Sequence, residues 1–203
     1  MIAIIDYGMG NLRSVLKKFE NLKIDARITN DLNEISNADK LILPGVGHFA
    51  NGIKNLKEKK LWEVLNEKVL IKRTPVLGIC LGMQLMADYS EEGNCEGLKW
   101  FDADVIKFRI KDKLKFKVPH MGWNQLKIER SCILSDGISE FDTFYFVHSY
   151  HIKCKNKEDV IFSTDYEYNF TSAINKGNIW GVQFHPEKSH KSGEQMLKNF
   201  SLI

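Results

Sequence analysis

The stretch Pro75-Val-Leu-Gly-Ile-Cys80-Leu-Gly-Met-Gln-Leu-Met-Ala87 starts as an apolar run and continues with residues that favour a helix. It predicts a buried strand over 76–79 that leads directly into a helix, with Cys80 at the junction. The small residues Gly78 and Gly82 allow the sharp turn of a nucleophile elbow, and a helix N-terminus favours the thiolate form of a cysteine. The pattern therefore predicts a reactive Cys80. The alternative is a small buried cysteine that only packs between strand and helix.

On the N-terminal side of this stretch, short β-branched runs alternate with amphipathic runs. This alternation predicts parallel strands joined by crossover helices. In the last helical run, Lys57 to Lys60 supplies the solvent-exposed face, so this helix should cover the sheet. The expected strands are 2–5, 25–28, 40–43 and 76–79, and the expected helices are 11–20 and 52–68.

On the C-terminal side, from Ala103 to Gln183, the pattern changes to successive strand-like runs separated by polar or Gly-containing turns. Antiparallel or mixed pairing is expected there, followed by a final amphipathic helix that places Met196, Leu197 and Phe200 on one face. The expected strands are 143–147, 160–164, 171–175 and 179–184. Because no repeat or linker interrupts the pattern, we expect an α/β fold in one domain, 1–203, with a mixed central sheet and flanking helices.

The composition excludes several classes of protein. The 203 residues are 43% hydrophobic, enough for one core that buries about 70% of the unfolded surface. A net charge of +3 is too small and dispersed for a nucleic-acid partner, so we expect none. The segment from Arg109 to Val118 reads as a charged insertion without an assigned role.

Neither a leader nor a disulfide framework is indicated. The first residues lack a basic leader and a long apolar run, so we expect a cytoplasmic protein with no membrane segment. The four cysteines form no CxxC pair, which argues against a zinc ribbon and a disulfide scaffold. They are Cys80, Cys95, Cys132 and Cys154.

A candidate base lies in Trp180-Gly-Val-Gln-Phe-His185-Pro-Glu187, where a strand ends at a histidine followed two residues later by a carboxylate. A neutral imidazole at His185 could take the proton of the Cys80 thiol and return it to a leaving amine, while Glu187 holds the other ring nitrogen. A turn histidine and an ordinary acid after a helix-starting proline are the alternatives. With Cys80, the pair suits acyl transfer.

A third element is the Gly-rich turn Pro44-Gly-Val-Gly47, which follows a strand. Flexible backbone at Val46 and Gly47 could present amide N–H groups to an oxyanion, together with the N–H of Leu81. The alternative is a tight loop that needs glycine only for its shape.

The pair His148 and His151 has an i, i+3 spacing, but it lies in a strand-like stretch where these positions face opposite ways. We therefore expect no metal site.

Together, these motifs resemble the class I (triad) glutamine amidotransferases, whose fold is flavodoxin-like. Further motifs resemble one branch of that family, the glutaminase subunits of imidazole glycerol phosphate synthase. The resemblance covers nearly the whole chain. The motifs of that branch are Asp6-Tyr-Gly-Met-Gly-Asn11-Leu, Pro119-His-Met-Gly-Trp-Asn124 and Tyr145-Phe-Val-His-Ser-Tyr150.

The resemblance implies a role for each matching residue. Cys80 would be the nucleophile, His185 the acid and base, and Glu187 its orienting carboxylate. Gln84, together with the backbone around Gly47 and Ser149-Tyr150, would hold glutamine. Gln84 also lies one helical turn after Cys80, which is consistent with that role.

The resemblance also implies a partner. In relatives, glutamine is hydrolysed efficiently only in complex with a (β/α)8 cyclase that conducts ammonia to its own active site, and no cofactor or metal is required. Asn11, Trp123 and Asn124 match the stretch that docks on that barrel. We expect a heterodimer that serves histidine biosynthesis.

Three alternatives remain open on the sequence. A paralogous subunit would supply ammonia for amidation of a surface sugar, with the same glutaminase chemistry. A non-catalytic subunit would keep the fold and the interface without the reaction. A free-standing cysteine hydrolase would need no partner.

Overall fold

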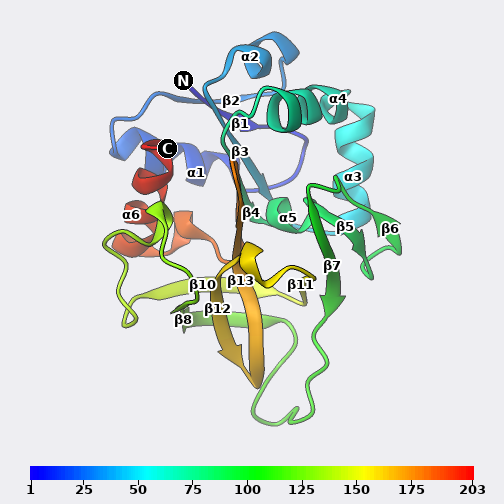
Figure 1. Ribbon diagram of the computed structural model, residues 1–203, viewed down its shortest axis with the longest axis vertical. Helices are drawn as coiled ribbons and strands as arrows, with labels where there is room; N and C mark the ends of the chain where they lie inside the picture. Colours follow the sequence, from blue (N-terminus) through cyan, green and yellow to red (C-terminus); the bar gives the residue numbers. More distant parts are fainter.

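A mixed eight-stranded sheet organises the molecule, in the order β2-β1-β3-β4-β14-β13-β12-β9 (Figure 1). The computed structural model describes residues 1–203. The five strands from β2 to β14 pair in parallel, and the remaining pairs are antiparallel. The predicted mixed sheet is thus confirmed. Its strands are β1 (Ile2–Ile5), β2 (Ala26–Thr29), β3 (Lys40–Gly45), β4 (Val76–Cys80), β9 (Lys127–Ile128), β12 (Val160–Tyr166), β13 (Tyr168–Lys176) and β14 (Ile179–Val182).

Two smaller sheets complete the β structure. One pairs β8 (His120–Gln125) with β10 (Thr143–His148) in antiparallel register. The other has the order β11-β7-β5-β6, built from β11 (Tyr150–Cys154), β7 (Phe101–Lys107), β5 (Ala87–Ser90) and β6 (Cys95–Glu96).

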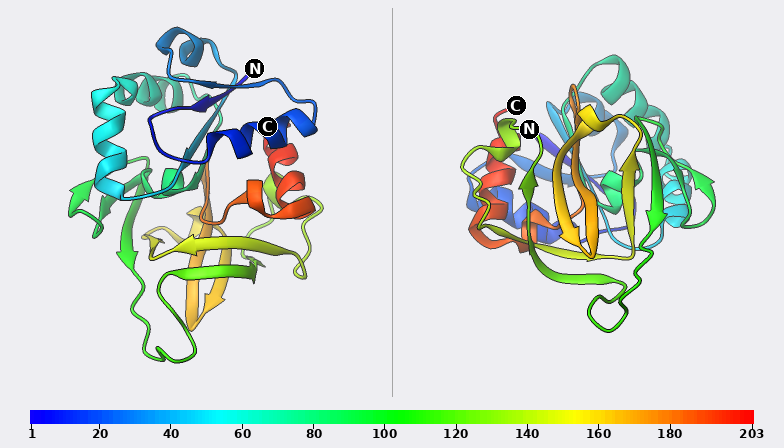
Figure 2. Two further views of the ribbon diagram at one scale, coloured as in Figure 1. Left: turned by 180° about the vertical axis from the view of Figure 1, so that it is seen from behind. Right: turned by 60° about the horizontal axis from the view of Figure 1, so that its bottom comes forward.

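Helices flank the sheet on both faces, as predicted (Figure 2). Helices α1 and α6 lie together on one face, and α3 and α4 lie on the other. None of the helices combines the length and the apolar character that crossing a bilayer requires. The helices are α1 (Leu12–Asn21), α2 (Leu32–Asn37), α3 (Phe49–Glu58), α4 (Leu61–Asn66), α5 (Leu81–Gln84) and α6 (His190–Ser201), with a π-helical segment η1 (Glu67–Ile71) and short 3-10 turns at Ile133–Ser135, Lys157–Asp159 and Pro186–Lys188.

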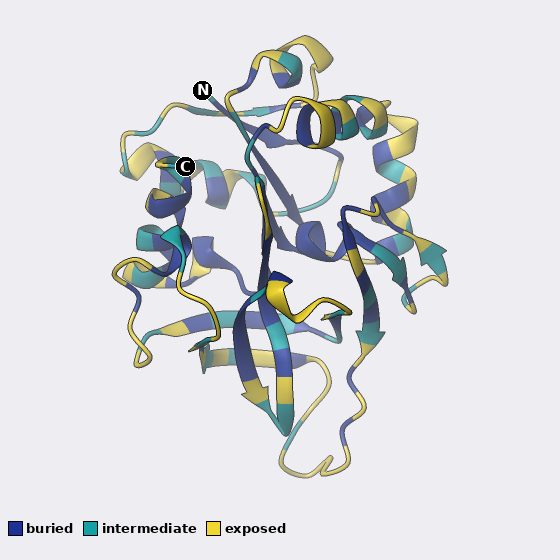
Figure 3. Ribbon diagram, viewed as in Figure 1, coloured by how far each residue is buried: buried dark blue, intermediate teal, exposed yellow.

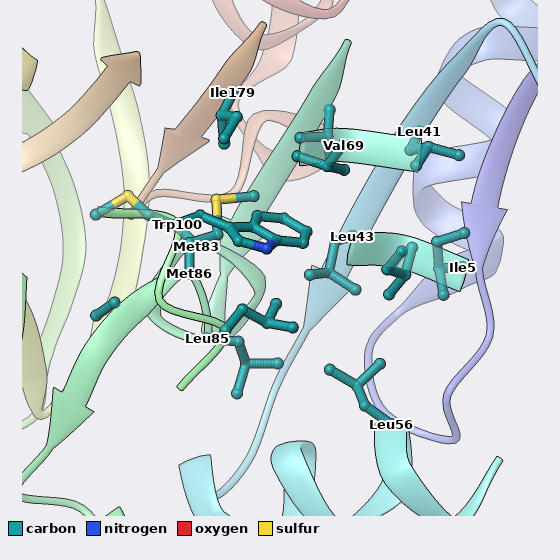
Figure 4. Packing of buried hydrophobic residues seen from close by; sticks show 14 of the residues in the cluster. Ile5, Leu41, Leu43, Leu56, Val69, Met83, Leu85, Met86, Trp100 and Ile179 are labelled. Carbon is teal, nitrogen blue, oxygen red and sulfur yellow. The ribbon is translucent and has the colours of Figure 1, made fainter. Parts of the chain in front are cut away.

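The central strands β1, β3, β4 and β14 are buried on both faces, which explains their continuous apolar runs (Figure 3). In β1, Ile2 and Ile4 join the core cluster beneath α1 and α6, whereas Ala3 and Ile5 join the cluster beneath α3 and α4. Figure 4 shows part of the second cluster, including Ile5, Leu43 from β3, Leu56 from α3 and Met83 from α5. The sheet therefore separates two apolar layers and is stabilised by both.

The expected helix over 52–68 is two helices. The α-helix ends at Glu58, and Lys60 adopts a left-handed backbone with φ of 57° before α4 begins. The apolar spacing continues across this turn, because both helices bury residues against the same face of the sheet. Hydrophobic periodicity alone could not reveal the break.

The helix expected after Cys80 is only four residues long, and Ala87 begins β5 instead. The backbone N–H of Leu98 donates to the carbonyl of Leu85, and the N–H groups of Trp100 and Phe101 donate to the carbonyl of Met86. Because a distant segment uses these carbonyl groups, the chain joins a sheet rather than continuing the helix. A single turn of helix contributes little macrodipole at Cys80.

Replacing Gly82 by alanine should destabilise the fold by about 1–3 kcal/mol, because the added Cβ would overlap the backbone carbonyl of Leu43. Gly52→Ala is the matched control: its Cβ would meet side-chain ends of Leu85 and Leu81 rather than backbone, and alanine favours the helix. Urea unfolding measures both variants. Equal urea midpoints for G82A and G52A would show that the contact at Gly82 does not exclude a Cβ.

Candidate active site

Cys80 occupies a strained position at the end of β4. Its φ of 54° and ψ of −111° are uncommon for a residue with a side chain and cost about 1–3 kcal/mol. The glycines beside it let α5 approach the sheet closely: a Cβ on Gly78 would lie 2.7 Å from the backbone nitrogen of Met83. Glycine is therefore required in the predicted elbow, because a side chain there would collide with the backbone.

His185 follows β14, the strand that pairs directly with β4. Its Nδ1 lies 2.8 Å from Oε1 of Glu187, and both side chains are almost fully buried. The backbone N–H of His185 donates to the carbonyl of Tyr145, and the hydroxyl of Ser189 donates to the carbonyl of His185. Since a carboxylate only accepts, Nδ1 carries a hydrogen and Nε2 is left for the thiol.

Burial and neighbouring charges act in opposite directions on the pKa of His185. Burial lowers the pKa of the imidazole, but the negative charge of the Cys80 thiolate, a hydrogen bond to Cys80 and the carboxylate of Glu187 together raise it to about 10. Nε2 is buried without a hydrogen bond of regular geometry, and Cys80 is the group that interacts with it. The arrangement favours transfer of the thiol proton to the imidazole, and the resulting thiolate–imidazolium pair is the reactive form of a cysteine nucleophile.

A pocket of about 300 Å³ opens beside Cys80. It brings together all the residues that the sequence suggested for the oxyanion and for the substrate. They are Val46, Gly47, Leu81, Gln84, Ser149 and Tyr150. Gly47 has a φ of 112°, which favours glycine at this position. His185 and Glu187 do not line the pocket but lie buried behind it.

Glu92 lines the same pocket but was not predicted. It is the one carboxylate among the lining residues, and its Oε2 accepts a hydrogen bond from the backbone N–H of Phe49 at the start of α3. Glu92 precedes a glycine turn in a polar loop, so no local pattern distinguishes it from an ordinary surface acid.

Gln183 is a second residue that the sequence analysis missed. Its Nε2 lies 3.7 Å from Sγ of Cys80, and its Oε1 accepts a hydrogen bond from Gln84 at 3.0 Å. The side chain is completely buried. A glutamine within the apolar run from Ile179 to Phe184 is a signal, because a buried polar group requires partners.

The three residues proposed for docking lie away from the pocket. Asn11 caps α1 by accepting from the backbone N–H of Ser14. Trp123 on β8 is half exposed and stacks on His190 at 4.7 Å, and Asn124 donates to the carbonyl of Asp165.

The expectation that His148 and His151 face opposite ways is wrong. The chain turns at Ser149, between β10 and β11, so both rings pack against Phe108, with centroid distances of 5.1 and 4.8 Å. The two side chains belong to a buried aromatic cluster.

The charged insertion connects β7 to β8 as an exposed loop at the base of the view in Figure 1. The carboxylate of Glu167, at the turn between β12 and β13, accepts hydrogen bonds from the backbone N–H groups of Lys111 and Asp112. The hydroxyl of Tyr166 bonds both the N–H and the carbonyl of Lys117. The loop is thus anchored through its backbone.

A buried thiol, imidazole and carboxylate beside a small pocket define an acyl-transfer enzyme with a cysteine nucleophile. Comparison with known proteins gives its family. Residues 3–203 match the family model described as glutamine amidotransferase class-I. The chain belongs to this family.

Similar sequences extend over the whole chain. It is 53% identical to imidazole glycerol phosphate synthase subunit HisH 2 of Methanococcus maripaludis, over 98% of both chains. It is 46% identical to the subunit HisH 2 of Pseudomonas aeruginosa, again over 98% of both chains, and 46% identical to the subunit HisH 1 of Campylobacter jejuni over the full length of both.

Solved structures agree on the fold. A glutamine amidotransferase from Thermotoga maritima has a TM-score of 0.65 at 16% identity, covering 98% of this chain and 81% of that chain. The glutaminase domain of Trypanosoma brucei CTPS has a TM-score of 0.66 at 20% identity, covering 99% and 93%.

The pH dependence of alkylation tests the thiolate–imidazolium pair. A thiol that has passed its proton to His185, whose pKa is raised to about 10, reacts as the thiolate, so the rate of Cys80 alkylation by iodoacetamide should be nearly flat from pH 7 to 9. Glu187→Gln removes a charge that favours the imidazolium, so alkylation should be about fivefold to tenfold slower at pH 7 and rise with pH. If the wild-type protein and E187Q had the same pH profile of alkylation, the thiolate–imidazolium pair would be refuted.

Proposed function

We propose that this chain is the glutaminase subunit of imidazole glycerol phosphate synthase, which hydrolyses glutamine and supplies ammonia to a synthase partner in histidine biosynthesis. The observation that carries the proposal is the triad of Cys80, His185 and Glu187, whose nucleophile Cys80 lines a pocket that fits one small amino acid. The identity of 53% with a subunit of that name, over nearly all of both chains, supports the pathway.

The reaction follows from the geometry. The Cys80 thiolate attacks the carbon of the glutamine side-chain amide, and the resulting oxyanion accepts hydrogen bonds from the backbone N–H groups of Leu81 and of Val46 or Gly47. The His185 imidazolium gives its proton to the leaving nitrogen, which departs as ammonia. The neutral imidazole then takes a proton from water, which hydrolyses the thioester to glutamate and frees the thiolate.

The pocket supplies groups for the two ends of glutamine. Gln84 and the Ser149-Tyr150 segment would hold the amide and the α-groups. Glu92 adds a negative charge for the α-ammonium group, because it is fixed by the backbone N–H of Phe49 and faces the same space. No proposed step uses a cofactor or a metal ion.

We further propose that the partner is a cyclase with a (β/α)8 barrel, bound as a heterodimer in the cytoplasm. The face of β8 supports this docking site: Met121 and Trp123 are 62% and 47% exposed, whereas His120 is buried and Gly122 and Asn124 are half-buried. Large exposed apolar side chains at regular spacing on one strand are typical of an interface. Asn11 and Asn124 would contribute polar contacts.

Cys80→Ala should abolish glutamine-dependent synthesis by the complex, by at least about 10³-fold, while synthesis from added ammonia persists. Cys95→Ser, at another free cysteine, is the control and should retain activity. The assay reconstitutes the chain with the histidine-pathway cyclase and measures glutamate release with and without the cyclase ligand. If C80A retained glutamine-dependent synthesis, the proposed mechanism would be wrong.

The same assay tests the pathway. If only the barrel partner of a sugar-amidating enzyme stimulates glutaminase turnover, the pathway assignment is wrong although the chemistry is right. Full turnover without any partner would favour a free-standing hydrolase.

Trp123→Ala should raise the dissociation constant of the complex about 10- to 100-fold, because a buried aromatic anchor contributes strongly at interfaces. Ile71→Ala is the matched control, since Ile71 is 77% exposed but follows α4, away from β8. Binding is measured by calorimetry. An equal loss of binding affinity in both variants, or no loss in W123A, would place the interface elsewhere.

A further inference from the structure

A continuous series of hydrogen bonds leads away from the nucleophile. Nε2 of Gln183 donates to Sγ of Cys80 over 3.7 Å, and Oε1 of Gln183 accepts from Nε2 of Gln84 at 3.0 Å. The same Nε2 of Gln84 donates its second hydrogen to the carbonyl of Tyr150 at 2.9 Å. Both amide hydrogens of Gln84 are thereby used, which fixes the orientation of its side chain.

From the carbonyl of Tyr150, the series continues through two histidines to the surface. Nδ1 of His148 lies 2.8 Å from this carbonyl, and Nε2 of His148 lies 3.0 Å from Nδ1 of His120. Nε2 of His120 lies 3.5 Å from Nδ2 of Asn124 on β8. The series therefore connects Cys80 to Asn124, whose neighbours on the strand, Trp123 and Gln125, are exposed.

The hydrogen positions in the histidine pair follow from the partners. A carbonyl can only accept, so Nδ1 of His148 carries the hydrogen and its Nε2 accepts from Nδ1 of His120. This assignment requires neutral rings, and burial lowers the pKa of His120 to about 4 and the pKa of His148 well below its usual value. Asn124 then donates to Nε2 of His120. Each bond has one donor and one acceptor.

The side chains in this series are shielded from water. Gln183 is fully buried, and His120, His148 and Gln84 are 3%, 6% and 5% exposed. His120 is also stacked between Phe146 and Tyr166, with centroid distances of 4.9 and 4.0 Å. Because buried polar groups that lose a partner are not rescued by solvent, each member holds the next in place.

We propose that Gln183, His148 and His120 are positioning residues for the Cys80 thiol, and that their hydrogen-bond series transmits contacts at Asn124 to the nucleophile. Gln183 acts directly, because an N–H donor aimed at sulfur favours the thiolate. The histidines act through the carbonyl of Tyr150 and Gln84, whose orientation decides whether Gln183 can donate. The role in catalysis rests on the proposed glutaminase function.

The test measures Cys80 alkylation in the isolated chain, followed on the Cys80 peptide by mass spectrometry because three other thiols are present. Gln183→Leu should slow the reaction with iodoacetamide at pH 7 about tenfold and make it rise with pH. His120→Phe, which keeps an aromatic ring, should slow it about threefold. Asn124→Ala should also slow the alkylation of Cys80.

His151→Phe is the matched control. His151 packs in the same cluster around Phe108, but it bonds the carbonyl of Ile152 and the hydroxyl of Tyr168, outside the series. It should leave the alkylation profile unchanged. Equal slowing by H120F and H151F would show a packing effect and overturn the proposal, as would an unchanged profile in Q183L.

Gln183→Glu keeps the proposal testable if Q183L fails to fold. It preserves the size and the acceptor for Gln84 but replaces the N–H donor with a carboxylate, so alkylation should be slowed at least as strongly; an unchanged rate overturns the proposal. Because thiol alkylation needs neither glutamine nor a partner, its outcome is independent of the C80A assay for glutaminase function.

Discussion

The close contact between α5 and strand β3 is the constraint on which the rest of the site depends. At Gly82 there is no space for a Cβ because the carbonyl of Leu43 occupies it, and Gly78 is similarly closed by the backbone of α5. This contact holds Cys80 at a positive φ that the isolated residue would avoid. The packing of two core layers against the sheet offsets that strain, so the stability of the fold and the reactivity of one thiol are coupled.

Strand order then assembles the remaining groups. Because β4 and β14 are parallel neighbours, Cys80 and His185 both emerge at the carboxyl end of the sheet, where loops can surround a ligand. Strand β3 lies on the other side of β4 and brings the Val46–Gly47 turn to the same edge. Cys80 and Gln183 are about 100 positions apart in the chain, and the pairing of β4 with β14 brings them together.

The sequence predicted the features that depend on local pattern. The mixed sheet, the flanking helices and most strand positions could be predicted, because apolar periodicity and turn residues encode them. The break at Lys60 and the early end of α5 could not, since distant carbonyl acceptors and left-handed backbone leave no periodic signal. In the site, residues within motifs were recognised, whereas Glu92 and the partners of Gln183 depend on three-dimensional proximity.

The anchored loop between β7 and β8 has a consequence for how related proteins can diverge. Its conformation is specified largely by the Glu167 carboxylate and the Tyr166 hydroxyl, which bond its backbone rather than its side chains. The alternating cations of Lys111, Lys113 and Lys115 can therefore be exchanged for other residues without remodelling the loop. Mutation can change the surface charge of this region while the catalytic elements, encoded elsewhere in the chain, stay the same.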